Sequence, residues 1–94
     1  MEHAPDFEPR TAVVTGSDSG IGRATAVALA AAGMDVGITW HRDEEGAERT
    51  AEEVRSYDRR AVVARLDTTE LERCGAVVDG LVEGLGGLDV FVHN

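Results

Sequence analysis

The sequence predicts an α/β fold in which a doubly wound parallel sheet follows the order β-α-β-α-β-α-β. Short apolar runs, typical of strands buried on both faces, alternate with longer segments whose apolar residues repeat at helical spacing. These segments are joined by loops of a few residues, and such alternation implies parallel strands connected by right-handed crossovers. A glycine-rich run at residues 15–22 separates the first strand from the first helix.

The first half of the chain supplies two strands and two helices. Residues 10–15 are expected to form the first strand and residues 35–40 the second. Between them, residues 20–32 form a helix that ends at Gly33, because glycine is common just past a helix. Its predicted apolar side consists of Ile21, Ala24, Ala28 and Leu29. Residues 41–43 form a turn, and residues 44–57 form a helix with one apolar face, made of Ala47, Ala51 and Val54.

The second half adds a strand, a helix and a final strand. Residues 60–66 form the third strand, with residues 61–64 as its buried centre. Thr68 or Thr69 is expected to cap the next helix, with acidic residues in its first turn where they favour the helix dipole. Its apolar stripe is Leu71, Cys74, Val77, Val78, Leu81, Val82 and Leu85, and Gly86 and Gly87 end it. Residues 88–92 form the fourth strand, and Met34 and Phe91 are assigned to the core.

The fourth strand is the last element that the sequence predicts. With no covering helix after it, this strand would be an exposed apolar edge, which native proteins usually avoid. We therefore expect the chain to be truncated after the fourth strand of a longer sheet. The alternative is a small domain whose edge a partner subunit covers.

Composition limits the classes of partner. The chain has 94 residues, enough for one small domain, and a formal charge of −9 from 18 acidic and 9 basic residues. This balance argues against nucleic acid, which requires clustered positive charge. Cys74 is the single cysteine, which fits a reducing cytoplasm, and no apolar run reaches membrane-spanning length. Residues 1–9 are acidic, contain two prolines and are expected to be a flexible leader.

The glycine-rich run predicts a phosphate site. A turn between a strand and a helix directs backbone N–H groups and the positive end of the helix dipole at one point. Gly16 supplies a backbone conformation that other residues resist, Gly20 leaves room for a phosphate, and Gly22 permits close packing. The spacing is G-x-x-x-G-x-G rather than the commoner dinucleotide pattern G-x-G-x-x-G.

The chain from residue 10 onward resembles the short-chain dehydrogenase/reductase family. The matches are the run from Thr15 to Gly22, Asp67 after the third strand, and residues 88–94, which are similar to the family's fourth strand and its Asn-Asn-Ala-Gly motif. His93 departs from the pattern, because the family usually has an asparagine there. The resemblance implies a Rossmann-type fold, with residues 10–94 as an NAD(P)-binding half-domain. It also implies hydride transfer between a nicotinamide cofactor and a carbonyl or alcohol substrate.

The resemblance implies no catalytic residue within this chain. The family's serine and its Tyr-x-x-x-Lys pair lie in its later half. Here the sole tyrosine, Tyr57, is not followed by a lysine, and the chain contains no lysine at all. Arginine cannot replace it, because a guanidinium does not release its proton near neutral pH. We expect the 94 residues alone to be inactive.

The resemblance also implies the cofactor contacts. The backbone of residues 17–21, together with the hydroxyls of Ser17 and Ser19, would hold the pyrophosphate, with Ile21 in that segment. Asp67 would accept a hydrogen bond from the adenine amino group, with Thr68 beside it, and Asn94 would contact the ribose on the nicotinamide side. The alternatives are that the serines only stabilise the turn and that Asp67 is a helix cap.

The end of the second strand indicates which cofactor is preferred. NAD-dependent proteins usually have an acidic residue about 20 positions after the glycines to bind the ribose hydroxyls. Here Trp40, His41 and Arg42 stand in that region. A carboxylate would repel a 2′-phosphate, whereas a guanidinium binds it with two charge-assisted hydrogen bonds. The sequence therefore predicts NADP over NAD, with Arg42 as the main contact and His41 or Trp40 beside the adenine. The alternative is that Arg42 pairs with Asp43 or Glu45.

Two classes of function follow. The first is an NADP-dependent oxidoreductase of which this chain is the dinucleotide-binding part, with a small carbonyl or alcohol substrate and a homo-oligomeric state expected from the resemblance. The second is a non-catalytic nucleotide-binding or interaction module, or a gene remnant, with the same fold. No metal site is predicted, because the histidines and Cys74 lack ligand spacing.

Overall fold

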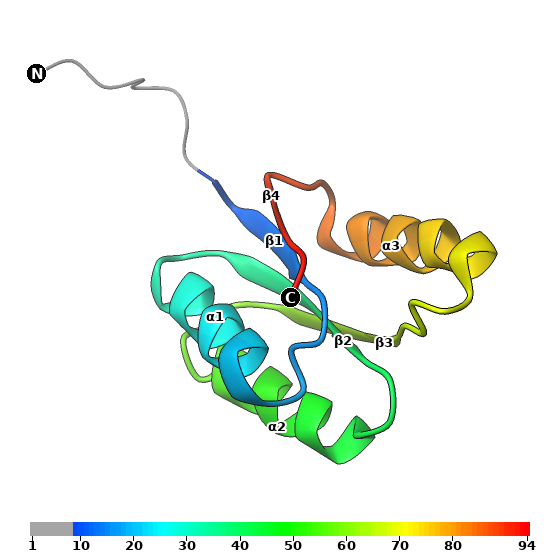
Figure 1. The fold of residues 1–94 in the computed structure, drawn as a ribbon. Coiled ribbons are helices and arrows are strands. Elements are labelled where there is room, and N and C mark those ends of the chain that lie inside the picture. The colour runs from blue at the N-terminus through cyan, green and yellow to red at the C-terminus, as the bar shows by residue number, and fades with distance from the viewer. Residues whose placement is uncertain (1–8) are drawn as a thin grey trace, which may run out of the picture.

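The computed structural model describes residues 9–94, except for the Leu71 side chain, so the predicted leader lies almost wholly outside the described residues. The strands are β1 (Thr11–Val14), β2 (Asp35–Trp40), β3 (Ala61–Arg65) and β4 (Val90–Val92). The helices are α1 (Gly20–Ala31), α2 (Glu44–Arg55) and α3 (Leu71–Leu85). All strands are parallel and form one sheet in the order β3-β2-β1-β4 (Figure 1). The predicted α/β class and element order are confirmed.

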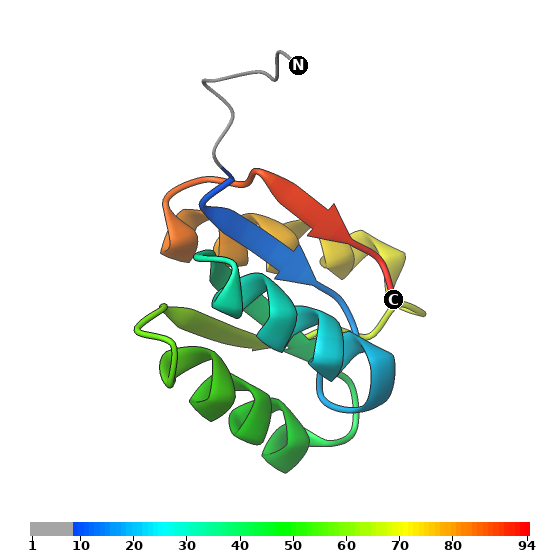
Figure 2. The same ribbon diagram turned by 90° about the vertical axis from the view of Figure 1, so that its left-hand side faces the viewer.

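The helices cover both faces of the sheet. Figure 2 shows α1 and α2 together on one side of the strands and α3 on the other. Each side has its own apolar core. The larger core joins Val14, Val36 and Ile38 to α1 and α2, and the smaller joins Val13 to Leu81 and Leu85 of α3. Gly37 permits this second packing, because a Cβ there would lie 3.1 Å from Val13 Cγ2 and 3.4 Å from Leu85 Cδ1.

The strand order reverses at β1. The chain moves outward from β1 to β2 and β3, then returns to place β4 on the opposite side of β1. In open parallel sheets the crevice at such a switch point, beyond the carboxyl ends of the strands, is where ligands bind. The glycine-rich run leaves β1 at this end, and Asn94 follows β4 at the same end.

The buried face of α1 differs from the prediction. Gly22, Ala26 and Ala30 are buried, whereas Ile21 is 78% exposed and the other predicted core alanines, Ala24 and Ala28, are exposed as well. The helix is alanine-rich all round, so its pattern does not single out one face. The smallest residues face the strands, where they allow a close approach between helix and sheet.

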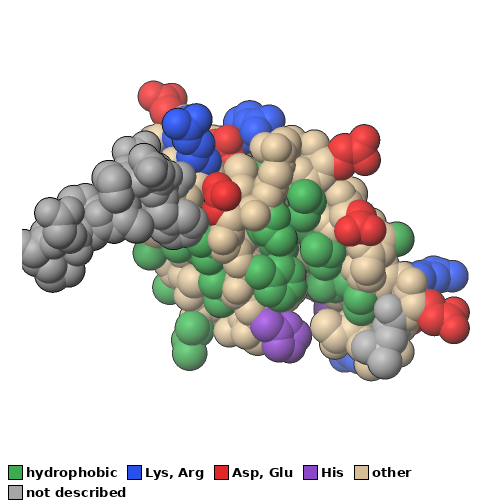
Figure 3. All heavy atoms as spheres, turned by 90° about the horizontal axis from the view of Figure 1, so that it is seen from above, with side chains coloured by type: hydrophobic (Ala, Val, Ile, Leu, Met, Phe, Trp, Pro, Cys, Tyr) green, Lys and Arg blue, Asp and Glu red, His purple; other side chains and the backbone are tan. Residues whose placement is uncertain are grey.

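Two predictions about the strands are also wrong. Phe91 is 47% exposed rather than buried, and residues 61–64 are only half-buried. The physical reason is the same, because β3 and β4 are the two edges of the sheet as described. Met34 is buried as predicted. On the side of the molecule where β4 lies, hydrophobic side chains gather in the middle of the surface (Figure 3).

Helix α3 begins later than predicted and is not capped by a threonine. Its N-cap is Glu70, whose side chain makes no capping hydrogen bond. Thr69 instead donates its backbone N–H and its hydroxyl to Asp67 Oδ1, at 2.9 and 2.6 Å. This aspartate-centred turn directs the Thr69 side chain to Asp67, one residue before the N-cap position, rather than to the amides of the helix.

The amino ends of the strands are joined by a clamp centred on Asp35. Its carboxylate accepts from the backbone N–H of Arg60 at 2.8 Å and from the Arg60 guanidinium at 3.1 Å, and Arg59 Nε lies 3.5 Å away. Arg60 also donates to the carbonyls of Gly84 and Leu85 at the end of α3, where positive charge complements the helix dipole.

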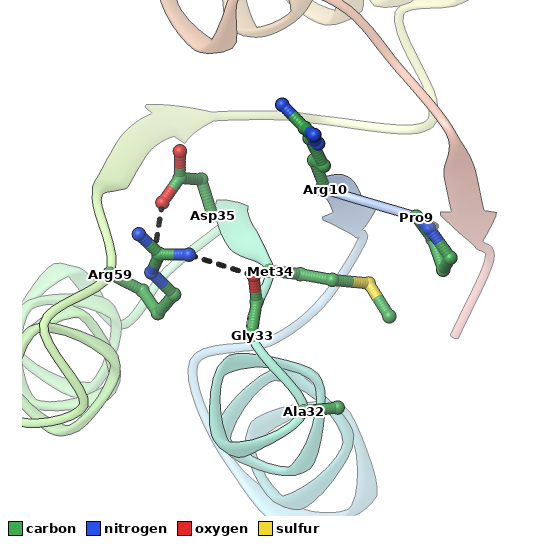
Figure 4. Close-up of a pocket in the computed structure, with 7 residues that line it drawn as sticks. All are labelled: Pro9, Arg10, Ala32, Gly33, Met34, Asp35 and Arg59. Atoms are coloured by element: carbon green, nitrogen blue, oxygen red, sulfur yellow. Dashed lines mark hydrogen bonds and ion pairs between the residues drawn. The ribbon is translucent and has the colours of Figure 1, made fainter. Parts of the chain in front are cut away.

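Figure 4 shows the neighbouring cavity of about 690 Å³, with Arg59 reaching both Asp35 and the Gly33 carbonyl. This cavity lies at the amino ends of the strands, and the glycine-rich run lies at their carboxyl ends.

The clamp shifts the pKa of Asp35. Partial burial raises this pKa, but the hydrogen bonds from Arg60 and the charges of Arg59 and Arg60 outweigh burial, so the pKa lies below its ordinary value. A carboxyl with a lowered pKa stabilises the fold above its unfolded pKa, and this contribution is lost as the pH falls through the folded pKa.

Asp35→Asn is therefore expected to lower the free energy of unfolding at pH 7 by about 1.5–3 kcal/mol, the typical value of hydrogen bonds to a charged group. The deficit relative to the unsubstituted protein should begin to shrink as the pH falls below about 4, where the carboxyl of the unfolded chain binds its proton, and should vanish only below the lowered pKa of the native carboxyl. Urea unfolding across this pH range measures both effects. Asp79→Asn, which removes an exposed carboxylate from α3, is the charge-matched control. A deficit that stays constant with pH would contradict the ionic role.

Candidate functional site

The glycine-rich run forms a tight turn that its glycines make possible. Gly16 and Gly20 have φ values of +60° and +59°, in the left-handed region that favours glycine. Gly22 is buried for a different reason. A Cβ at this position would overlap the carbonyl oxygen of Gly16 and lie 2.7 Å from Asn94 Nδ2. The first turn of α1 therefore packs directly against the loop that precedes it.

The turn presents unpaired backbone donors. Helix α1 starts at Gly20, and within residues 9–94 the backbone N–H groups of Gly20, Ile21 and Gly22 have no hydrogen-bond acceptor. Ser19, the N-cap, is exposed and its side chain makes no capping bond. Orphan amides and the positive end of the helix dipole together attract a negatively charged group.

Buried hydroxyls hold this turn from below. Gly16 N donates to Thr39 Oγ1 at 2.9 Å, and Ser17 N donates to the Thr39 carbonyl at 3.1 Å. The Ser17 hydroxyl donates to the Val14 carbonyl at 2.8 Å, and the Thr50 hydroxyl donates to the Ser17 carbonyl at 2.7 Å. These bonds tie the turn to β2 and to α2.

The proposed phosphate contact of Ser17 therefore needs correction. This residue is fully buried, and both its hydroxyl and its N–H already bond within the protein. A pyrophosphate could use its hydroxyl only by breaking the bond that holds the turn. Ser17 stabilises the turn, which is the alternative that the sequence left open, and Ser19 is the serine whose side chain faces solvent.

The chain after β4 closes the other side of the turn. Asn94 Nδ2 donates to the Gly16 carbonyl at 3.1 Å, and Asn94 N donates to Thr15 Oγ1 at 3.0 Å. His93, which departs from the family's pattern, lies with Nδ1 3.2 Å from the same Thr15 oxygen. Since this hydroxyl accepts from Asn94, it can donate its own hydrogen to the neutral imidazole. The histidine thus keeps β4 joined to the turn.

The end of β2 carries aromatic and basic side chains. Trp40 is half-buried, and the Arg65 guanidinium lies 5.8 Å from the centre of its ring. Arg65 Nε also donates to the His41 carbonyl at 3.2 Å. Arg42 is exposed, and among the described residues no carboxylate lies within 4 Å of it. The acids considered as its alternative partners, Asp43 and Glu45, instead lie 4.0 and 3.9 Å from Arg49.

Asp67 joins the ends of β2 and β3. Its Oδ1 accepts from Thr69, and its Oδ2 lies 3.2 Å from Nε2 of His41. The hydrogen bonds from Thr69, then the charges of His41 and Arg65, hold the pKa of Asp67 below its ordinary value. The carboxylate is therefore ionised near neutral pH, as a hydrogen-bond acceptor for a ligand should be. Thr68, next to it, is exposed.

A cleft of about 190 Å³ lies at the carboxyl ends of the strands. The predicted residues that line it are Gly16, Trp40, His41, Thr68 and Asn94. Ser19, Gly20, Ile21, Arg42 and Asp67 lie outside its lining, and Ser17 lies behind the turn. Among the described residues, no group of three or more His, Cys, Asp or Glu side chains could hold a metal ion. None of the described helices has the length and apolarity to cross a membrane.

Sequence reasoning missed the residues that support the site. Thr39 and Thr50 are fully or almost fully buried among apolar neighbours, and each bonds to the turn. Gly46 lets α2 approach it, since a Cβ there would lie 2.5 Å from the Asp18 carbonyl oxygen. One available signal was a polar residue on an apolar strand or helix face, which requires a buried hydrogen-bond partner. Arg65 left no such signal, because an arginine at a strand end reads as solvated.

Comparison with known proteins identifies relatives along nearly the whole chain. The family model described as short chain dehydrogenase matches residues 10–94. Uncharacterized oxidoreductase YohF of Escherichia coli (strain K12) is 47% identical over 85 residues, which are 90% of this chain and 34% of that protein. Glucose 1-dehydrogenase 2 of Bacillus subtilis (strain 168) is 37% identical over 89 residues, or 95% of this chain and 34% of that protein.

Solved structures share the fold. Acetoin dehydrogenase YohF from Salmonella typhimurium superposes with a TM-score of 0.85 at 43% identity, covering 89% of this chain and 33% of that one. Carveol dehydrogenase from Mycobacterium avium, solved in complex with NAD, gives a TM-score of 0.84 at 34% identity, covering 90% of this chain and 35% of that one. The chain thus spans about a third of the length of the relatives it matches.

The packing at Gly22 yields a direct test of the turn. Gly22→Ala should lower the free energy of unfolding by about 1–3 kcal/mol, because the added methyl group overlaps the Gly16 carbonyl in a packed site. Gly80→Ala in α3 is the matched control, since its Cβ meets nothing within 4 Å and alanine favours helix by about 0.5–1 kcal/mol. Urea unfolding of both variants is the measurement. Equal effects of the two substitutions would show that the close approach at Gly22 is not a constraint.

Proposed function

This chain belongs to the short-chain dehydrogenase family, and from that premise we propose that residues 10–94 are the dinucleotide-binding part of an NADP-dependent oxidoreductase. The observation that carries the choice of NADP is the end of β2. It holds no carboxylate at the position where ribose hydroxyls would be bound, and it holds an exposed guanidinium, that of Arg42, with no carboxylate within 4 Å among the described residues. Such a group suits a 2′-phosphate.

The turn between β1 and α1 is the proposed pyrophosphate site. The free N–H groups of Gly20, Ile21 and Gly22 would donate to its oxygens, and the hydroxyl of Ser19 lies at the same helix end. Gly16 shapes the turn, and the Ser17 backbone fixes it to β2. The fit is favourable because these donors have no acceptor within residues 9–94, so a ligand would not have to break bonds among the described residues.

Most of the remaining proposed cofactor contacts line the cleft at the carboxyl ends of the strands. Trp40 and His41 would lie beside the adenine, Asp67 would accept from its amino group, and Thr68 would be adjacent. Asn94 would contact the ribose on the nicotinamide side. The support is the common position of these residues at the carboxyl ends of the strands, where four of them line or border one cleft.

The bound dinucleotide would supply or accept a hydride for a small carbonyl or alcohol substrate. The sequence of these 94 residues does not contain the Tyr-x-x-x-Lys pair that the family resemblance assigns to proton transfer. The chain has no lysine, and its sole tyrosine, Tyr57, is 49% exposed just past α2. The residues described therefore bind and orient the cofactor, and we expect the 94 residues alone to be inactive.

The remaining parts of the proposal concern the whole protein. The relatives named for acetoin and carveol support a small alcohol or carbonyl substrate. We also propose a homo-oligomer, as is usual in this family, and a cytoplasmic location, which the single cysteine supports. The exposed apolar surface around β4 supports the alternative, a non-catalytic interaction module, because such a surface suits contact with other protein. Hydride transfer by the full-length protein would exclude that alternative.

Replacement of Arg42 tests the choice of cofactor. Arg42→Ala should weaken NADPH binding about 10- to 100-fold, the value of a charge-assisted contact of about 1.5–3 kcal/mol, and leave NADH binding unchanged within about twofold. Cofactor fluorescence titration of the full-length protein measures both. Arg49→Ala, which removes an arginine of α2 that lies near Asp43 and Glu45, is the control and should alter neither. Equal losses for the two cofactors, or a protein that prefers NADH before substitution, would refute the assignment.

A further inference from the structure

The cavity of about 690 Å³ at the amino ends of the strands, here called the amino-end cavity, has two unlike sides. Met34 extends between Ala32 and Pro9, which gives an apolar side (Figure 4). Asp35 and Arg59 lie opposite them, and Arg10 also belongs to the wall, which gives a charged side. Pockets of this size commonly hold ligands, and their occupants meet both apolar and polar groups.

The charged side of the amino-end cavity carries an excess of positive charge. Arg59 donates to the Gly33 carbonyl at 2.9 Å and lies 3.5 Å from Asp35, yet its side chain is still 39% exposed. Asp35 is shared, because it also accepts from the Arg60 guanidinium at 3.1 Å. Arg10 is exposed, and within residues 9–94 no carboxylate lies within 4 Å of its guanidinium. This side of the cavity therefore suits an occupant with carboxylates.

The chain segment that leads into the cavity wall carries such carboxylates. Residues 1–8, which lie outside the described residues, contain Glu2, Asp6 and Glu8 and neither arginine nor lysine. Phe7 is their one aromatic residue. In an extended chain successive side chains point to opposite sides, so Phe7 would face away from both Asp6 and Glu8. Pro9 favours this extended form in the residue that precedes it.

We propose that residues 6–8 dock in the amino-end cavity, with Phe7 against its apolar side and the two acids toward Arg10 and Arg59. Phe7 is two residues from Pro9, so the tether reaches at most about 7 Å, and Pro9 is itself part of the wall. A tethered segment binds at a high effective concentration, so weak contacts suffice. The inference concerns a segment that the sequence alone predicts to be flexible, and it does not depend on the proposed cofactor.

The two kinds of contact have different effects on the docked segment. Burial of the Phe7 ring supplies an attraction that has no direction, whereas exposed ion pairs alone contribute little. The carboxylates of Asp6 and Glu8 set the orientation, because the reverse placement would press them against the apolar side without hydrogen-bond partners. The orientation therefore depends on charge, and its charge-dependent part weakens as salt screens the ion pairs.

Proteolysis of the full-length protein after Phe7 tests the docking, because a protease cleaves the segment only when it is released. Chymotrypsin should cleave this bond at least about tenfold more slowly in the protein than in a synthetic peptide of residues 1–12, with the cleavage site identified by mass spectrometry. Arg10→Glu should reduce this protection to about threefold or less. Arg73→Glu replaces an 82% exposed arginine of α3, is the charge-matched control and should leave the protection unchanged.

Substitutions in the leader make the test independent of any effect of Arg10→Glu on the fold. Asp6→Asn combined with Glu8→Gln changes no residue of the sheet or its helices. The double variant should lose protection to the same extent, measured against a peptide with the same two substitutions. Cleavage of the unsubstituted protein at the rate of its peptide would overturn the docking. Protection that survives both sets of substitutions would place the leader on another surface and would overturn it as well.

Discussion

The site depends on a layer of buried hydroxyl groups beneath the glycine-rich turn. A turn built from glycines is flexible by itself, and its amides could face in many directions. Here Thr39 and Thr50, from two other elements, take up the inward-facing backbone groups of residues 16 and 17. Among the described residues, the amides of residues 18–22, at and just before the start of α1, are left without partners. The amide groups that face outward keep one orientation because the backbone groups that face inward are hydrogen-bonded.

The same constraint explains why β4 matters to the turn. The strand pairs with β1 and delivers Asn94 to the carbonyl of Gly16, so the turn is bonded from the side as well as from below. Gly22 completes this arrangement, because any side chain there would enter the space that the Gly16 carbonyl and the Asn94 amide share. The geometry of the turn therefore depends on the order of the strands in the sheet. The reversal at β1 brings β4 to the side from which this contact is made.

The sequence was sufficient for features that depend on local pattern. Apolar runs, glycines and loop lengths predicted the class of fold, the order of elements and the turn itself. It was insufficient where the outcome depended on which neighbours pack together. The buried face of α1 could not be chosen among alanines, and the exposure of Phe91 followed from the edge position of its strand. Ser17 was predicted to bind phosphate because the sequence does not reveal that its hydroxyl donates to the Val14 carbonyl.

His41 and Asp67 were each predicted as separate contacts of the cofactor, and their spacing in the sequence gave no reason to connect them. The parallel pairing of β2 with β3 brings the two strand ends together, so two residues 26 positions apart meet at 3.2 Å. A proposed cofactor contact therefore has to be judged together with its neighbours, because Asp67 already lies against His41 and accepts from Thr69 within the protein.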